Sequence, residues 1–103
     1  MRLDPATIAP VLQAVRESFG DTAQVWLFGS RTDDAKRGGD IDLYIETDLD
    51  RDIVTRRSDL LRRLEAIYGE QKIDLAIRPR SRAPHPLHEI ARERGIRLSD
   101  AAR

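Results

Sequence analysis

Two aspartates one residue apart, shortly after a Gly-Ser pair, are the feature that most constrains this 103-residue chain. The segment 40–46, which contains Asp40 and Asp42, has the apolar alternation of a β-strand. Because successive side chains of a strand point to opposite faces, both aspartates lie on one face and the apolar residues beside them on the other. Two adjacent carboxylates repel unless a cation lies between them. The spacing therefore predicts a site for a hard divalent cation, for which Mg²⁺ fits best.

Helix and strand patterns alternate along the rest of the chain. Apolar spacing predicts helices over 4–19, about 50–68 and 86–94, and strands over 23–28, 40–46 and 72–77, with a possible edge strand at 96–98. Gly20 and Gly69 are expected to end the first two helices, and Val54 is expected on the buried face of the second. Pro10 predicts either a kink in the first helix or a main helix that begins near it. Residues 78–86, rich in arginine and proline, are expected to form an extended connection. This order predicts one α/β domain over residues 1–103, with helices packed on a small mixed sheet.

A third carboxylate, Asp74, lies on the predicted strand 72–77, facing away from the core side chains of that strand. A helical crossover can place this strand beside strand 40–46, which would bring Asp74 next to Asp40 and Asp42. With two divalent ions, three such carboxylates form a clamp for phosphoryl or nucleotidyl transfer. Gly29 allows close backbone approach, Ser30 can bind phosphate, and Arg31 can add a charge-assisted contact.

Composition excludes several classes of function. Lys and Arg together number 18, as do Asp and Glu, so no overall charge favours direct nucleic-acid binding. No cysteine is present, which rules out disulfides and thiolate zinc sites. No apolar run reaches the length of a transmembrane helix, and the N-terminus lacks a signal-peptide core. We therefore expect a cytoplasmic protein without a membrane partner.

The other conspicuous residues have plain structural interpretations. Asp48, Asp50 and Asp52 precede a predicted helix, where caps and dipole partners are common. The helical face that carries Arg56, Arg57, Arg62 and Arg63 is expected to be solvated, or to meet an acidic partner. The remaining residues are expected to lie in the core or in a stiff linker rather than in a catalytic site: Trp26, His85 and His88.

The Gly-Ser pair, the loop and Asp-x-Asp together resemble the signature of the polymerase-β-like nucleotidyltransferase superfamily. Within it, the short chain is similar to the minimal nucleotidyltransferases, which often act as antitoxins of HEPN-domain ribonuclease toxins. The resemblance implies a site with two Mg²⁺ ions held by Asp40, Asp42 and Asp74. It also implies that ATP phosphates are held by Gly29 and Ser30, and that AMP is transferred to a tyrosine of the partner toxin.

Two functions from different classes are consistent with this resemblance. The first is an enzyme that moves AMP to a hydroxyl of a partner protein, because little chain remains to build a separate acceptor domain, so that the partner or a second copy supplies those contacts. The second is a catalytically silent antitoxin that neutralises its partner by complex formation. The sequence favours the first, since all three carboxylates and Gly-Ser are present. Transfer to a small molecule fits so short a chain less well.

Overall fold

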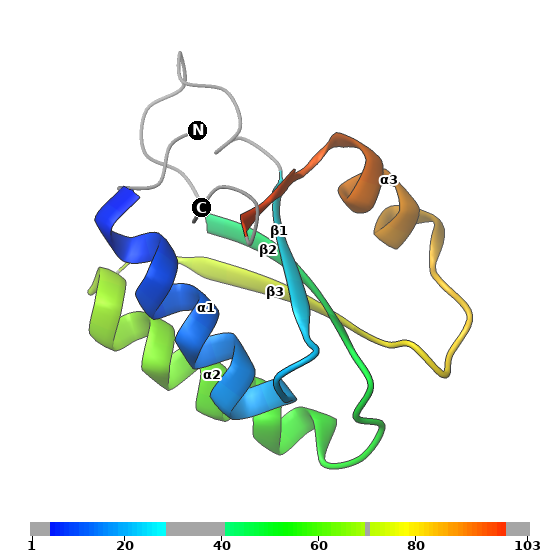
Figure 1. Ribbon diagram of the computed structural model, residues 1–103, viewed down its shortest axis with the longest axis horizontal. Helices are drawn as coiled ribbons and strands as arrows, with labels where there is room; N and C mark the ends of the chain where they lie inside the picture. The colour runs from blue at the N-terminus through cyan, green and yellow to red at the C-terminus, as the bar shows by residue number, and fades with distance from the viewer. Residues whose placement is uncertain (1–4, 29–40, 70, 99–103) are drawn as a thin grey trace.

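The computed structural model describes residues 5–28, 41–69 and 71–98, which form an α/β fold as predicted (Figure 1). The described elements follow one another as α1 (Pro5–Phe19), β1 (Gln24–Phe28), β2 (Ile41–Thr47), α2 (Ile53–Tyr68), β3 (Ile73–Pro79), α3 (Pro86–Arg94) and β4 (Ile96–Arg97). This is the order that the sequence pattern predicts, including the short final edge strand.

The four described strands form one mixed sheet in the order β3-β2-β1-β4. Strand β1 pairs antiparallel with both β2 and β4, whereas β2 and β3 run parallel. Parallel neighbours require a crossover connection, and α2 provides it between β2 and β3. The predicted mixed sheet and the predicted adjacency of the second and third strands are therefore confirmed.

Helices α1 and α2 pack together on one face of the sheet, where the main core lies (Figure 1). Alternate residues of β1 and β2 enter this core, and Leu60 and Leu64 of α2 are fully buried against it. The other face carries a smaller cluster in which Trp26 and Tyr44 pack against Ala91 of α3. Strand β1 is therefore covered on both faces, and the prediction that Trp26 is a core residue is confirmed.

Glycine ends the first two helices, as predicted. Gly20 and Gly69 have φ of 98° and 72°, a left-handed range that side chains other than glycine rarely adopt. Their N–H groups donate to carbonyls four residues earlier, which closes each helix. Gly95 follows α3 for a different reason: a Cβ there would lie 2.4 Å from the carbonyl oxygen of Ala91.

Three details differ from the predictions. Helix α1 runs continuously through Pro10, so the helix does not begin at that residue. Val54 was expected on the buried face of the second helix, yet it is 80% exposed because Ile53 and Leu60 define that face instead. Strand β3 extends through Arg78 and Pro79, which were expected in the connection. Proline is tolerated there because the strand lies at the edge of the sheet.

The acidic residues before α2 do not cap it, contrary to prediction. Asp52 occupies the N-cap position in a left-handed conformation (φ 56°) and makes no side-chain capping bond. Asp48 instead accepts hydrogen bonds from Thr22 and Arg80, and Asp50 accepts one from Ser81. These aspartates hold the β2–α2 connection to the segment that follows β3.

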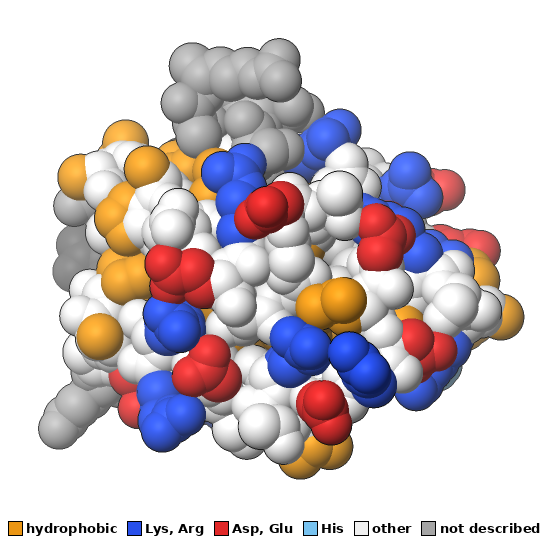
Figure 2. Space-filling model, turned by 60° about the horizontal axis from the view of Figure 1, so that its bottom comes forward, with side chains coloured by type: hydrophobic (Ala, Val, Ile, Leu, Met, Phe, Trp, Pro, Cys, Tyr) orange, Lys and Arg blue, Asp and Glu red, His pale blue; other side chains and the backbone are white. Residues whose placement is uncertain are grey.

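Charged side chains of both signs are interspersed on the face shown in Figure 2, in keeping with the equal numbers of basic and acidic residues. Arg63 of α2 pairs with Asp59 and with Glu17 of α1, and Arg62 also contacts Asp59. The arginines of this helix face are thus partly paired within the chain. None of the helices in the described part of the chain is both long and apolar enough to cross a bilayer.

The core packing predicts the effect of truncating α2. Leu64→Ala is expected to lower the free energy of unfolding by about 2–5 kcal/mol, because it removes a fully buried side chain and leaves a cavity. Val54→Ala, on the exposed side of the same helix, should change it by less than about 0.5 kcal/mol. Urea unfolding followed by circular dichroism measures both, and equal losses would contradict this description of the core.

Candidate active site

The structure places two of the predicted site residues side by side. Asp42 of β2 and Asp74 of β3 are direct partners in the parallel register. Residues in register on neighbouring strands point to the same face, here the face opposite α1 and α2. Asp42 is half-buried and Asp74 is exposed. Phe28, the last residue of β1, lies on the other side of Asp42. The expected adjacency of these two aspartates is confirmed, while their catalytic role stays a prediction.

The remaining predicted site residues lie outside the described residues: Gly29, Ser30, Arg31 and Asp40. Within residues 5–28, 41–69 and 71–98, no group of three histidine, cysteine or acidic side chains could hold a metal ion. The described part of the predicted site is therefore the pair formed by Asp42 and Asp74.

This pair has the chemistry that a divalent cation requires. Carboxylate oxygens are the ligands that Mg²⁺ prefers, and two carboxylates on adjacent strands repel each other in the absence of a cation. Asp42 and Asp74 would thus hold the ion, and one face of the site stays open because Asp74 is exposed at the edge strand. A bound Mg²⁺ would supply charge compensation at the phosphates of a nucleotide.

Comparison with family models decides the family. A model described as a nucleotidyltransferase domain matches residues 8–98, which is most of the chain and contains every described element from β1 to β4. The chain belongs to the nucleotidyltransferase domain family. This places it in the polymerase-β-like superfamily and supports nucleotidyl transfer as its general activity. Comparison with curated proteins finds no match.

The face that presents the acid pair of this nucleotidyltransferase domain continues along β2 and β3 as three rows of neighbours. Asp42 and Asp74 form the first row, Tyr44 and Ala76 the second, and Glu46 and Arg78 the third. Glu46 lies four residues after Asp42 along β2, which is about 13 Å along a strand. The third row therefore lies well away from the acid pair, although both are on the same face.

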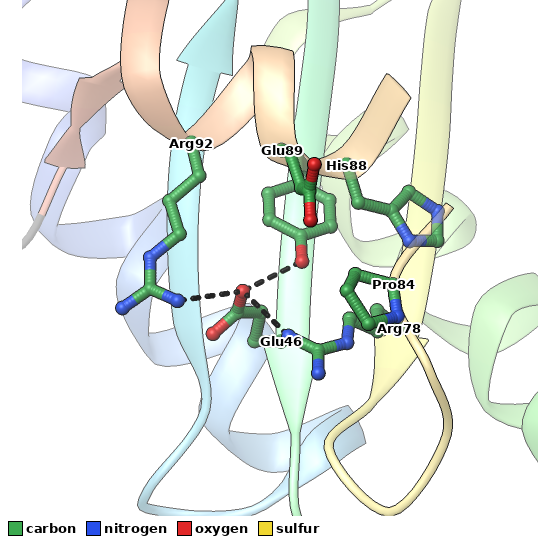
Figure 3. Close-up of a pocket in the computed structure, with 7 residues that line it drawn as sticks. Glu46, Arg78, Pro84, His88, Glu89 and Arg92 are labelled. Carbon is green, nitrogen blue, oxygen red and sulfur yellow. Dashed lines mark hydrogen bonds and ion pairs between the residues drawn. The ribbon is translucent and has the colours of Figure 1, made fainter. Parts of the chain in front are cut away.

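Glu46 is a buried carboxylate in the third row, with 3% of the residue exposed. The Tyr44 hydroxyl donates to its Oε2 at 2.6 Å, and Arg78 Nη1 donates to the same oxygen at 3.3 Å. Arg92 lies 3.8 Å from the carboxylate (Figure 3), and Arg80 lies at the same distance from its other oxygen. A buried carboxylate is tolerated only where charges and hydrogen bonds compensate it, and these groups do so.

The ring of Tyr44 links this charge cluster to α3. It lies 5.3 Å from the Trp26 ring and stacks on His88 at 5.1 Å. Arg92 lies over Trp26, 5.8 Å from the ring centroid. Burial and the hydrogen bond to Glu46 raise the pKa of Tyr44 to about 12, whereas burial and nearby His85 lower the pKa of His88. Both shifts favour the neutral form of the side chain.

A cavity of about 200 Å³ opens beside this cluster, between β2, β3 and α3 (Figure 3). The residues that line the cavity are Tyr44, Glu46, Arg78, Pro84, His88, Glu89 and Arg92. The sequence pattern did not lead us to predict this cavity. The alternation that places Asp42 and Tyr44 on one face also places Glu46 there, and an arginine-rich segment follows the neighbouring strand. That pattern was the available signal for a buried ion cluster.

The cluster predicts an asymmetric response to charge removal. Glu46→Gln is expected to lower the free energy of unfolding by about 3 kcal/mol, because it leaves the half-buried guanidinium of Arg78 without its counter-charge. Arg92→Gln should cost less than about 1 kcal/mol, since its side chain is 58% exposed. Urea unfolding of both variants tests this prediction. A Glu46→Gln variant as stable as the parent protein would show that the arginines do not depend on the Glu46 charge.

A second prediction concerns the stability of the fold at low pH. The hydrogen bond from Thr22, followed by that from Arg80, lowers the pKa of Asp48, and those from Ser81 and Arg82 lower the pKa of Asp50. Groups with a lowered folded pKa stabilise the fold above their ordinary pKa, and that stabilisation is lost as pH falls through the folded value.

The melting temperature is therefore expected to fall below about pH 4. The melting temperature of the double variant Asp48→Asn, Asp50→Asn should fall less over that pH range than the melting temperature of the parent protein. Melting curves at pH 7 and pH 3 make the comparison, with Asp21→Asn, on the exposed turn after α1, as the matched control. A double variant with the full acid loss of the parent protein would exclude these two aspartates as the cause.

Proposed function

We propose that this nucleotidyltransferase domain transfers AMP from ATP, with Mg²⁺, to a tyrosine hydroxyl of a partner protein, and so acts as an antitoxin to a HEPN-type ribonuclease toxin. The observation that carries the transfer reaction is the register of Asp42 and Asp74 on adjacent parallel strands. The family model supports nucleotidyl transfer in general. The tyrosine acceptor and the toxin partner rest on the resemblance of the chain to the minimal nucleotidyltransferases.

The proposed reaction is a substitution at the α-phosphorus of ATP. The acceptor oxygen forms a bond to that phosphorus, the bond to the bridging oxygen of the β-phosphate breaks, and pyrophosphate leaves as the acceptor hydroxyl loses its proton. Such a reaction needs placement and charge compensation rather than covalent participation of the protein. Asp42 and Asp74 would provide them by holding the divalent cation beside the phosphates.

Exposure of the acid pair supports a macromolecular acceptor. Asp74 is exposed and lies on an edge strand, and helix α3 packs against Trp26 and Tyr44, in the row next to the acid pair. A tyrosine on the surface of another protein can approach such an open position without entering a deep pocket. An acceptor of small-molecule size would be bound better by an enclosed pocket.

The test uses ATP labelled at its α-phosphate, Mg²⁺ and a HEPN-type protein encoded beside this chain. Transfer of label to that protein is expected, and Asp42→Asn or Asp74→Asn should each lower the rate by about 10²-fold, because each removes a carboxylate that would hold the divalent cation, and that cation compensates the transition-state charge. Asp48→Asn, just beyond the end of β2 that lies away from the acid pair, should leave the rate within a few fold.

The outcome also separates the silent antitoxin from the enzyme. A tight complex that blocks the toxin without label, in the parent protein and in Asp42→Asn alike, would overturn catalysis and leave neutralisation by binding. Label that appears equally with Asp74→Asn would overturn the assignment of that residue.

A further inference from the structure

Strand β3 leaves one side of its backbone unpaired among the described residues. Its seven residues pair with β2 on one side, and the sheet order ends at β3. Exposed strand edges present a row of hydrogen-bonding groups to any further strand. Ile73 and Ile77 of this strand are packed against the main core but only partly buried. A further strand beside β3 would cover them.

The hydrogen bonds at the two ends of β3 establish which backbone groups face outward. Ile41 donates its N–H to the carbonyl of Lys72, and Arg80 donates its N–H to the carbonyl of Thr47. Because successive residues of a strand direct their backbone groups to alternate edges, even-numbered residues of β3 face β2. The N–H and C=O groups of Ile73, Leu75 and Ile77 therefore point to the open edge.

From this arrangement we infer that two copies of the chain associate through β3, antiparallel and centred on Ala76. With the twofold axis at Ala76, Leu75 of each copy lies opposite Ile77 of the other, and the backbone groups of both residues point across the edge. Each of these two pairs exchanges two N–H···O bonds, so four bonds form about the axis. Ala76 lies opposite its own counterpart. The pairing is isologous and closed, as a twofold dimer requires.

Charge complementarity selects this register and this partner. Asp74 lies opposite Arg78 of the second copy, twice by symmetry, and opposite charges on facing strands stabilise pairing. Arg78 uses Nη1 for Glu46 and Nε for the Arg82 carbonyl, and no contact within the described residues uses Nη2. Shifting the centre to Leu75 would place Lys72 opposite Arg78, two like charges. Shifting it to Ile77 would bring Pro79, which lacks an N–H, opposite Leu75 and close to the axis, whereas the register centred on Ala76 keeps Pro79 at the end of the pairing, opposite Ile73.

The first experiment measures amide exchange of the unmodified protein by NMR over a range of concentrations, beside sedimentation velocity. A dimer is expected, together with concentration-dependent protection of the N–H groups of Leu75 and Ile77. The N–H groups of Asp74 and Ala76, which face β2, should be protected at every concentration. A monomer at all concentrations, or a dimer in which Leu75 and Ile77 exchange freely, would overturn the inference.

A cysteine variant tests the register without destabilising the strand. The chain has no cysteine, so Ala76→Cys introduces a single thiol at the twofold axis. Facing residues of a non-hydrogen-bonded pair have Cα atoms about 4.5 Å apart, within the range of a disulfide. Mild oxidation should cross-link this variant quickly. Arg97→Cys on β4, the opposite edge of the sheet, is the control, and faster cross-linking there would overturn the assignment to β3.

Discussion

The parallel pairing of β2 with β3 is the constraint on which the site depends. A one-residue slip of either strand would move Asp42 and Asp74 to opposite faces. Burial of Leu43 and Leu75 on the inner face prevents that slip, because the slip would expose them and bury a carboxylate. The helices on the inner face thus determine the position of groups on the outer face, which they do not contact. The core on the inner face and the acid pair on the outer face are thus separated only by the sheet itself.

Hydrophobic alternation was enough to predict β3 and its core face. Ile73, Leu75 and Ile77 alternate with Asp74 and Ala76, so the core face of β3 followed from period two alone. The mixed topology followed from the placement of one helical pattern between two strands. The continuity of α1 through Pro10 was predicted less well. Tertiary packing of Val11 and Val15 holds the helix together across a residue that disfavours helix interiors.

The side-chain contacts near the site could not be predicted in the same way. Asp48 and Asp50 precede a helix, which made capping the natural interpretation, but arginine and serine from the segment after β3 bind them instead. Those partners are more than 30 residues away in sequence, and no local pattern indicates which distant side chain a surface carboxylate meets. Glu46 is a similar case, since its burial depends on α3 lying over Tyr44.

The position of Asp74 on an edge strand imposes two requirements, which pairing along that edge meets together. An edge strand with outward backbone groups favours pairing with another strand, yet an acceptor must still reach the acid pair from the outer face. Pairing in the plane of the sheet satisfies both, because the added strand lies beside β3 and leaves the outer face uncovered. A twofold axis through Ala76 is perpendicular to the sheet, so the acid pairs of both copies open toward the same side. Packing of one outer face on another would cover them.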